Sequence, residues 1–223
     1  MLRPALPFLL AAAAVPGLCA HAQLKLAPVH DPHSYGNPDE IRMSHIALDL
    51  AVDFDKKVLS GTAILTVKHE RPGATKLVLD THGLDIDKVS AGRGKQLSAA
   101  PFKLGAEDKV LGAPLEIEIP KDATTVQIAY RTRPSAGGLQ WLEPSMTAGK
   151  RRPYLFSQSE SIYGRTWIPM QDSPSVRVTY TALIHTPEDL RAVMSADQDL
   201  SNRRTGSYFF KMDKPIPTYL IAL

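Results

Sequence analysis

Residues 43–53 (MSHIALDLAVD) and 58–68 (VLSGTAILTVK) decide the fold, because apolar and polar side chains alternate in both. The first stretch places its large apolar side chains on one face, at Ile46, Leu48, Leu50 and Val52. A period of two is typical of a β-strand with one buried face. Residues 54–57 (FDKK) between the two stretches read as a turn, so the sequence predicts an antiparallel hairpin.

The same alternation recurs along most of the chain. Further strands are expected at residues 76–79, 84–89, 114–119, 125–130, 175–185, 190–194 and 207–212. Turn clusters such as residues 71–73 (RPG) and 135–138 (SAGG) separate them, and no stretch keeps a helical period for three turns. The pattern therefore predicts an all-β fold, an antiparallel sandwich or saddle.

Composition excludes several classes of protein. Hydrophobic residues make up 43% of the 223 residues and charged residues 22%, which is ordinary for a globular protein and argues against disorder. Prolines number 18, too many for a helix bundle, since each one inside a helix costs roughly 3 kcal/mol. The formal charge is only +3, so nucleic acid is not expected as a partner.

The first 22 residues have the pattern of a secretory signal peptide. Arg3 is the positive start, residues 5–15 are apolar, and Ala20 and Ala22 stand at the positions that a signal peptidase reads. Cleavage is expected before Gln23, which makes residues 23–223 a periplasmic or secreted β domain with no membrane contact.

Two alternatives for this segment stay open. A membrane anchor needs about 20 apolar residues, and Pro16 and Gly17 interrupt this run. Lipoprotein processing at Cys19 would normally require a small residue where Leu18 stands. Signal cleavage would also remove this single cysteine, which leaves no disulfide and no Cys-ligated zinc in the mature domain.

A search for catalytic residues finds none within this chain. His69-Glu70 begins like a zinc-binding His-Glu-x-x-His helix, but Gly73 stands at the second histidine position and Pro72 would break the helix. We therefore expect His69 at a strand end. His185 and Glu188 are likewise separated by a proline, and neither a Gly-x-Ser-x-Gly elbow nor a glycine-rich phosphate loop is present.

The alternation fades between residues 138 and 174, where both tryptophans lie. Its aromatic residues are Trp141, Tyr154, Phe156, Tyr163 and Trp167, interleaved with Gln140, Gln158, Glu160, Arg165, Gln171 and Asp172. One interpretation is a polar ligand site with apolar walls. The other, which composition favours, is a long connection whose aromatic side chains close one end of the β core.

Several motifs in this order resemble a known family. They are residues 31–35 (DPHSY), 138–142 (GLQWL), 153–158 (PYLFSQ), 165–169 (RTWIP), 171–180 (QDSPSVRVTY) and 214–223 (KPIPTYLIAL). Together they resemble the N-terminal domain of the M1-family zinc aminopeptidases, most closely the branch that contains leukotriene A4 hydrolase. The resemblance extends over residues 26–223 and implies an antiparallel, saddle-like β domain.

The resemblance also implies a role for two residues. Gln158 and Glu160 match the family's Gln-x-Glu/Gln motif, so they would bind the free amino terminus of a peptide, where a carboxylate pairs with an ammonium group. Without the resemblance, Glu160 reads as a solvated loop charge. The family's zinc helix and Gly-x-Met-Glu-Asn loop lie beyond the equivalent of Leu223. No cofactor is therefore expected in this chain, and zinc is expected in a missing catalytic domain that would be its partner.

The end of the chain bears on the choice of function. Residues 219–223 (YLIAL) read as an apolar strand, and natural sheet edges are usually blunted by charge or proline. We therefore expect a chain cut inside an interdomain connection, which is the inactive N-terminal part of an exported zinc aminopeptidase. The alternative is a stand-alone periplasmic peptide-binding β module.

Overall fold

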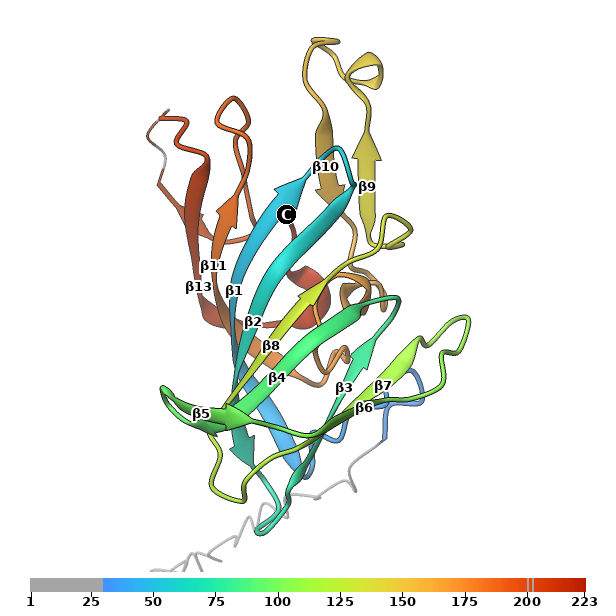
Figure 1. Cartoon of the computed structure of the whole chain (residues 1–223), viewed down its shortest axis with the longest axis vertical. Helices are drawn as coiled ribbons and strands as arrows, with labels where there is room; N and C mark the ends of the chain where they lie inside the picture. Colours follow the sequence, from blue (N-terminus) through green and yellow to red (C-terminus); the bar gives the residue numbers. More distant parts are fainter. Residues whose placement is uncertain (1–29, 200, 202) are drawn as a thin grey trace, which may run out of the picture.

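The computed structural model describes residues 30–223 apart from residues 200 and 202, and that part is built almost entirely of β-strands (Figure 1). The expected signal peptide, residues 1–22, lies outside the described residues. The largest sheet has eight strands in the order β12-β13-β11-β1-β2-β8-β4-β5. These strands are β1 (Ile41–Asp53), β2 (Val58–His69), β4 (Asp85–Arg93), β5 (Gln96–Ala99), β8 (Thr125–Arg131), β11 (Arg177–His185), β12 (Asp197–Gln198) and β13 (Ser207–Pro217).

Two smaller sheets complete the molecule. The first has the order β3-β7-β6 and consists of β3 (Lys76–Thr81), β7 (Ala113–Glu118) and β6 (Phe102–Leu104). The second is a hairpin of β9 (Leu139–Leu142) and β10 (Tyr154–Ser157), which projects from the opposite end of the molecule (Figure 1). The described helices are single 3₁₀ turns, η1 (Pro144–Met146), η2 (Gly164–Thr166) and η3 (Thr218–Leu220). None of the described helices has the length and apolar character needed to cross a membrane.

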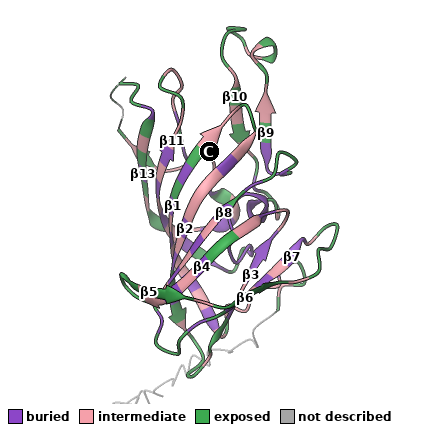
Figure 2. Ribbon diagram, in the orientation of Figure 1, coloured by how far each residue is buried: buried purple, intermediate pink, exposed green. Residues whose placement is uncertain are grey.

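The hairpin predicted from residues 43–68 is confirmed. β1 and β2 pair antiparallel from Asp53 opposite Val58 to Ile41 opposite His69, and residues 54–57 form the turn. The face that carries Ile46, Leu48 and Leu50 is buried and forms the centre of the hydrophobic core (Figure 2). Burial of alternate side chains explains why the period of two was a sufficient signal for these strands.

The expected all-β saddle or sandwich class is confirmed, with one pair of strands that differs from the antiparallel expectation. β11 lies parallel to β1, with Ile46 opposite Tyr180. The chain between β10 and β11 returns to the end of the sheet where β1 begins, and there Arg42 Nη1 donates to the Ser175 carbonyl at 3.1 Å. Alternation along one strand carries no information about the direction of its neighbour, so the sequence pattern could not reveal this pair.

The expected strand at residues 190–194 is wrong. Leu190 N–H donates to the Pro187 carbonyl at 3.0 Å, which makes a turn. The alternation itself is real, because Ala192 and Met194 are buried while Val193 is exposed. No neighbouring strand pairs with this segment in the described structure, so it packs on the core as irregular chain.

The apolar strand expected at residues 219–223 is also wrong. Its first part belongs to the 3₁₀ turn η3, and Ile221 is fully buried. Leu223 N–H donates to Ser157 Oγ at 2.9 Å, and Ser157 N–H donates to the Leu223 carbonyl at 2.8 Å. Serine groups and a neighbouring strand end therefore satisfy the backbone here, so this segment presents no free apolar edge.

Candidate functional site

The site predicted from the resemblance lies just beyond the end of β10. Along residues 154–160 the exposed side chains alternate with less exposed ones, and the exposed ones are Tyr154, Phe156, Gln158 and Glu160. Successive side chains of a strand point to opposite sides, so Tyr154 and Phe156 share one side of β10. The strand ends at Ser157 and a turn begins at Glu160, where the Tyr163 N–H donates to the Ser159 carbonyl at 2.9 Å and the Glu160 N–H donates to Gln158 Oε1 at 3.3 Å. We call the four exposed residues the exposed strip.

Ser159 holds the exposed strip in place from beneath. This residue is only 3% exposed, and its Oγ accepts a hydrogen bond from Trp167 Nε1 at 3.1 Å and donates one to the Ile221 carbonyl at 3.0 Å. One residue earlier, Gln158 N–H donates to the Gly138 carbonyl at 2.8 Å. With its backbone anchored on the core side, the segment directs the Gln158 and Glu160 side chains outward.

Gly138 allows this segment to approach its neighbours closely. A Cβ atom at this position would lie 2.6 Å from the Tyr163 carbonyl oxygen and 2.7 Å from Thr166 Oγ1. Gly138 N–H also donates to that Thr166 hydroxyl at 3.0 Å. A larger residue would therefore push the turn at residues 163–166 away from the exposed strip, which explains the glycine in the 138–142 motif.

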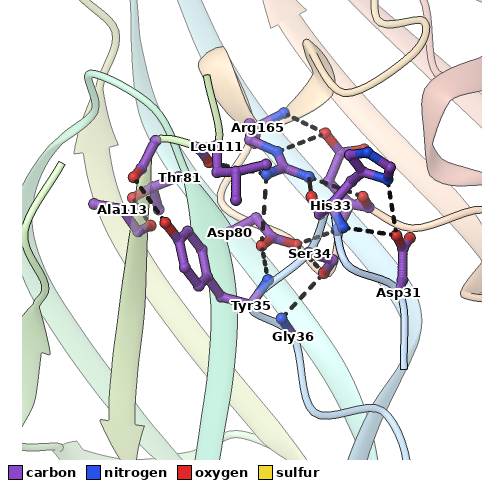
Figure 3. Close-up of polar contacts among 12 residues, drawn as sticks. Asp31, His33, Ser34, Tyr35, Gly36, Asp80, Thr81, Leu111, Ala113 and Arg165 are labelled. Carbon is purple, nitrogen blue, oxygen red and sulfur yellow. Dashed lines mark hydrogen bonds and ion pairs between the residues drawn. The ribbon is translucent and has the colours of Figure 1, made fainter. Parts of the chain in front are cut away.

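Arg165 is completely buried, and Figure 3 shows the polar groups around it. Its Nε lies 3.2 Å from Asp172 Oδ2, and its two terminal nitrogens donate to the carbonyls of Leu111 at 2.9 Å and His33 at 2.7 Å. Its Nη1 is also 3.8 Å from Asp80 Oδ1. One guanidinium group thus joins four segments that are distant in the sequence.

Asp80 supplies the other half of this buried cluster. Its carboxylate accepts hydrogen bonds from Ser34 Oγ and the Tyr35 N–H, both at 2.6 Å, and from the Asp172 N–H at 2.8 Å (Figure 3). Burial raises the pKa of Asp172 above its ordinary value of 3.8, an effect that the Arg165 charge opposes and the Asp80 charge reinforces. Since every charged group here already has a protein partner, the role of the cluster is structural: it holds separate segments of the chain together.

The structure therefore divides the polar residues of region 138–174 into two groups. Arg165, Gln171 and Asp172 are buried, and Gln171 takes the place of a strand partner: its Oε1 accepts from the Met43 N–H at 3.0 Å and its Nε2 donates to the Ile41 carbonyl at 2.8 Å. The exposed group is Gln140, Gln158 and Glu160. Burial of the first group agrees with the interpretation of a connection that closes the β core, whereas ligand binding by the exposed group stays a prediction.

The aromatic residues divide in the same way. Trp167 is fully buried in the core, which fits the view of a connection that closes the end of the β core. Tyr154, Phe156 and Tyr163 are among the exposed large hydrophobic residues. Asp80 is the buried charged residue that sequence reasoning missed, and the available signal was a carboxylate inside the apolar strand 76–81.

The described residues do not form a zinc site. As expected, His69 is the last residue of β2. Its Nδ1 lies 3.0 Å from the Ala74 carbonyl oxygen and its Nε2 lies 2.9 Å from that of Ala123, so main-chain groups occupy both ring nitrogens. Within residues 30–223, leaving out 200 and 202, no three His, Cys, Asp or Glu side chains are grouped so that they could hold a metal ion.

Comparison with known proteins gives a consistent result. The family model of the peptidase M1 N-terminal domain matches residues 32–220. Leukotriene A-4 hydrolase of Xenopus laevis is 40% identical over 205 residues, which are 86% of this chain and 33% of that protein. Leucine aminopeptidase 2 of Yarrowia lipolytica is 37% identical over 204 residues, 89% of this chain and 30% of that protein. The chain thus spans about a third of the length of these relatives.

Solved structures agree with this result. Native leukotriene A4 hydrolase from Saccharomyces cerevisiae superposes with a TM-score of 0.79 at 33% identity, covering 89% of this chain and 31% of that one. The M1 zinc metallopeptidase from Deinococcus radiodurans superposes with a TM-score of 0.65 at 23% identity, covering 82% and 41%, a likeness of fold alone.

Proposed function

The chain belongs to the peptidase M1 N-terminal domain family, and from that premise we propose that it is the substrate-amine-binding domain of an exported zinc aminopeptidase. In this proposal Gln158 and Glu160 bind the free amino terminus of a peptide. A separate catalytic domain removes the first residue. Leucine aminopeptidase 2 among the relatives supports this class of reaction.

The observation that carries the proposal is the anchoring of Ser159 between two exposed polar side chains. Because Ser159 is held by Trp167 and Ile221, the Gln158 and Glu160 side chains are presented outward with little backbone freedom to lose on binding. A carboxylate pairs with a peptide ammonium group through charge-assisted hydrogen bonds, and the amide oxygen of Gln158 can accept a further one. A peptide with a blocked amino terminus would lack this interaction.

The chemistry at the peptide bond is assigned to the catalytic domain. The described residues contain no group of three side chains that could hold a zinc ion, whereas a related fold is that of a zinc metallopeptidase. The metal would polarise the scissile carbonyl and activate water there. This chain contributes the recognition and orientation of the amino terminus.

Export of the domain is part of the proposal and rests on residues 1–22. The positive start, apolar run and small residues of that segment support cleavage before Gln23 and a periplasmic or secreted location. Amino-terminal sequencing of the protein from the periplasmic and culture fractions tests this. A mature chain that starts at Gln23 is expected, and recovery of an uncleaved chain in the cytoplasmic fraction would contradict it.

The amine-binding role is tested by substituting Glu160 in an enzyme that contains both this domain and its catalytic domain. Loss of one partner of a charge-assisted contact costs about 1.5–3 kcal/mol, so Glu160→Ala should lower kcat/KM for aminoacyl substrates at least about tenfold. Glu160→Gln should lose less, since an amide oxygen still accepts from the ammonium group. Zinc content and thermal stability should remain unchanged.

Glu118→Ala is the matched control, because Glu118 is exposed at the end of β7 in the three-stranded sheet. It should leave kcat/KM unchanged. If Glu160→Ala retained full activity, or lost it only together with thermal stability, Glu160 would be a solvated loop charge and the proposed role would fail.

A further inference from the structure

A pocket of about 780 Å³ lies between the tip of the β9–β10 hairpin and the segment between β11 and β13, which contains the short strand β12 and which we call the loop. Four arginines line it, Arg151 and Arg152 from the hairpin and Arg191 and Arg204 from the loop. The single carboxylate in the lining is Asp189. For a chain whose overall charge is only +3, this is a strong local excess of positive charge.

Main-chain carbonyls hold the two arginines of the loop in position. Arg191 donates from Nη1 to the Ser201 carbonyl at 3.0 Å and from Nη2 to the Asp199 carbonyl at 2.8 Å. Arg204 Nη1 donates to the Asp189 carbonyl at 2.6 Å. Main-chain carbonyls fix the position of a guanidinium group without cancelling its charge, and each group retains further N–H donors for a ligand.

The two arginines of the hairpin differ from each other. Arg152 forms an ion pair with Asp189, which ties the hairpin to the loop. Arg151 is exposed and has no hydrogen-bond or ion-pair partner within the described part of the chain. Asp199, which is outside the lining, accepts hydrogen bonds from the Ser201 N–H at 2.8 Å and the Ser201 hydroxyl at 2.7 Å. These bonds and the nearby Arg191 charge lower the pKa of Asp199, so this carboxylate offsets part of the positive charge of Arg191.

The wall formed by the hairpin is ordered before any ligand binds. Thr147 Oγ1 lies 2.9 Å from the carbonyl oxygens of both Pro144 and Arg152, which share its single hydroxyl hydrogen, and Lys150 N–H donates to the Thr147 carbonyl at 3.1 Å. These bonds close the tip into a defined loop, which fixes the main chain that carries Arg151 and Arg152. A preorganised site binds its ligand at a lower entropic cost.

We propose that this pocket, which we call the arginine pocket, binds a ligand with two or more phosphate groups. Four arginines against one carboxylate leave an excess of three positive charges, and two phosphate groups carry about three to four negative charges near pH 7. The planar guanidinium group binds phosphate oxygens in pairs, which suits arginine better than lysine to this task. Leu142, Tyr154 and Leu190 add apolar surface for the rest of an organic ligand.

The arginine pocket is separate from the amine-binding residues. Tyr154 lines it, and Gln158 stands four residues further along an extended segment, which corresponds to about 13 Å. Phosphate binding therefore does not depend on the proposed amine-binding function, and one can fail without the other.

Titration calorimetry of the full 223-residue chain with pyrophosphate at low ionic strength tests the proposal. We expect one site per chain and weaker binding as sodium chloride is raised. Arg151→Gln should raise Kd at least about tenfold, because one charge-assisted contact is lost. Since Arg151 holds no other part of the described structure, this variant should keep the wild-type unfolding temperature.

Arg93→Gln is the control, because Arg93 is an exposed arginine at the end of β4 far from the hairpin (Figure 1). It should bind pyrophosphate like the wild type. The proposal is overturned if pyrophosphate does not bind, or if Arg151→Gln and Arg93→Gln weaken binding equally, which would indicate general surface charge.

Vesicles then distinguish the source of the phosphate. If vesicles that contain cardiolipin, a lipid with two phosphate groups, but not phosphatidylcholine vesicles, bind the chain and are displaced by pyrophosphate, the ligand is a membrane headgroup. If pyrophosphate binds and vesicles do not, the ligand is a soluble phosphate compound. Either result, with the same dependence on Arg151, supports the arginine pocket.

Discussion

Trp167 Nε1 lies 3.1 Å from Ser159 Oγ, and both residues are buried. This hydrogen bond connects the hydrophobic core to the segment that presents Gln158 and Glu160. The serine hydroxyl has a second role, because it donates to the Ile221 carbonyl near the end of the chain. The Ser159 side chain therefore fixes the main chain between Gln158 and Glu160, the two proposed substrate-binding residues.

Ser159→Ala should destabilise the domain. It leaves the Trp167 indole N–H and the Ile221 carbonyl buried without this partner, at a cost of about 1–3 kcal/mol. For a domain of this size, each kcal/mol lowers Tm by about 2–4 °C. Thermal unfolding followed by circular dichroism measures the change. Ser161→Ala, at an exposed position, is the control and should leave Tm unchanged.

Arg165→Met should destabilise the domain by about 3–5 kcal/mol at neutral pH, because Asp172 and Asp80 then share a buried site without a cation. Urea unfolding at pH 7 and pH 4.5 measures the loss. If the variant does not fold at pH 7, the milder Arg165→Lys replaces it in the same comparison.

The loss should be smaller at pH 4.5 than at pH 7. Burial raises the pKa of Asp172, so the folded state takes up a proton more readily than the unfolded chain. The cost of its ionised form is therefore relieved as pH falls toward the folded pKa. Arg133→Met is the control, since its pair with Asp85 at 2.8 Å is exposed and worth about 0–1 kcal/mol. Equal losses at the two pH values would contradict the assigned cause.

His45 should make stability fall on mild acidification. Partial burial lowers its pKa below the ordinary value of 6.5 in the folded state, beside Thr179 Oγ1 at 2.7 Å. The unfolded chain therefore binds the proton first, so stability is fully present above about pH 6.5 and decreases as pH falls below it. Urea unfolding between pH 5 and pH 8 should show a smaller pH dependence for His45→Gln than for the wild type. The idea fails if His33→Gln, at an exposed position, has the same effect.

The purified chain alone should hold no zinc after dialysis and should release no product from an aminoacyl-amide reporter. The reason is the absence of a grouped ligand set among the described residues, together with the hydrogen bonds that occupy both nitrogens of His69. Metal analysis beside the activity assay tests this. One zinc ion per chain with turnover above a boiled sample would refute it.

Sequence reasoning reached the amine-binding residues by resemblance, not by their own chemistry. A glutamate two residues after a glutamine has no distinctive pattern, and Glu160 alone reads as a loop charge. The arginine pocket was also beyond the sequence, because its two short basic runs, residues 150–152 (KRR) and 203–204 (RR), are far apart: Arg151 and Arg204 are separated by 53 positions. Arg151 and Arg204 line one pocket only because the hairpin and the loop lie side by side, where Arg152 forms an ion pair with Asp189.

The sequence by itself determined the strands whose buried face is written into local alternation, such as β1 and β2, and the turn at residues 54–57 between them. Side-chain period is a local property, so it can be read without knowing the neighbours of a strand. Only the tertiary structure decided that β11 lies parallel to β1 and that Arg165 joins Asp172, Asp80 and His33. Both depend on where distant segments end in space, because a charged side chain can be buried only where partners from elsewhere in the chain compensate its lost hydration.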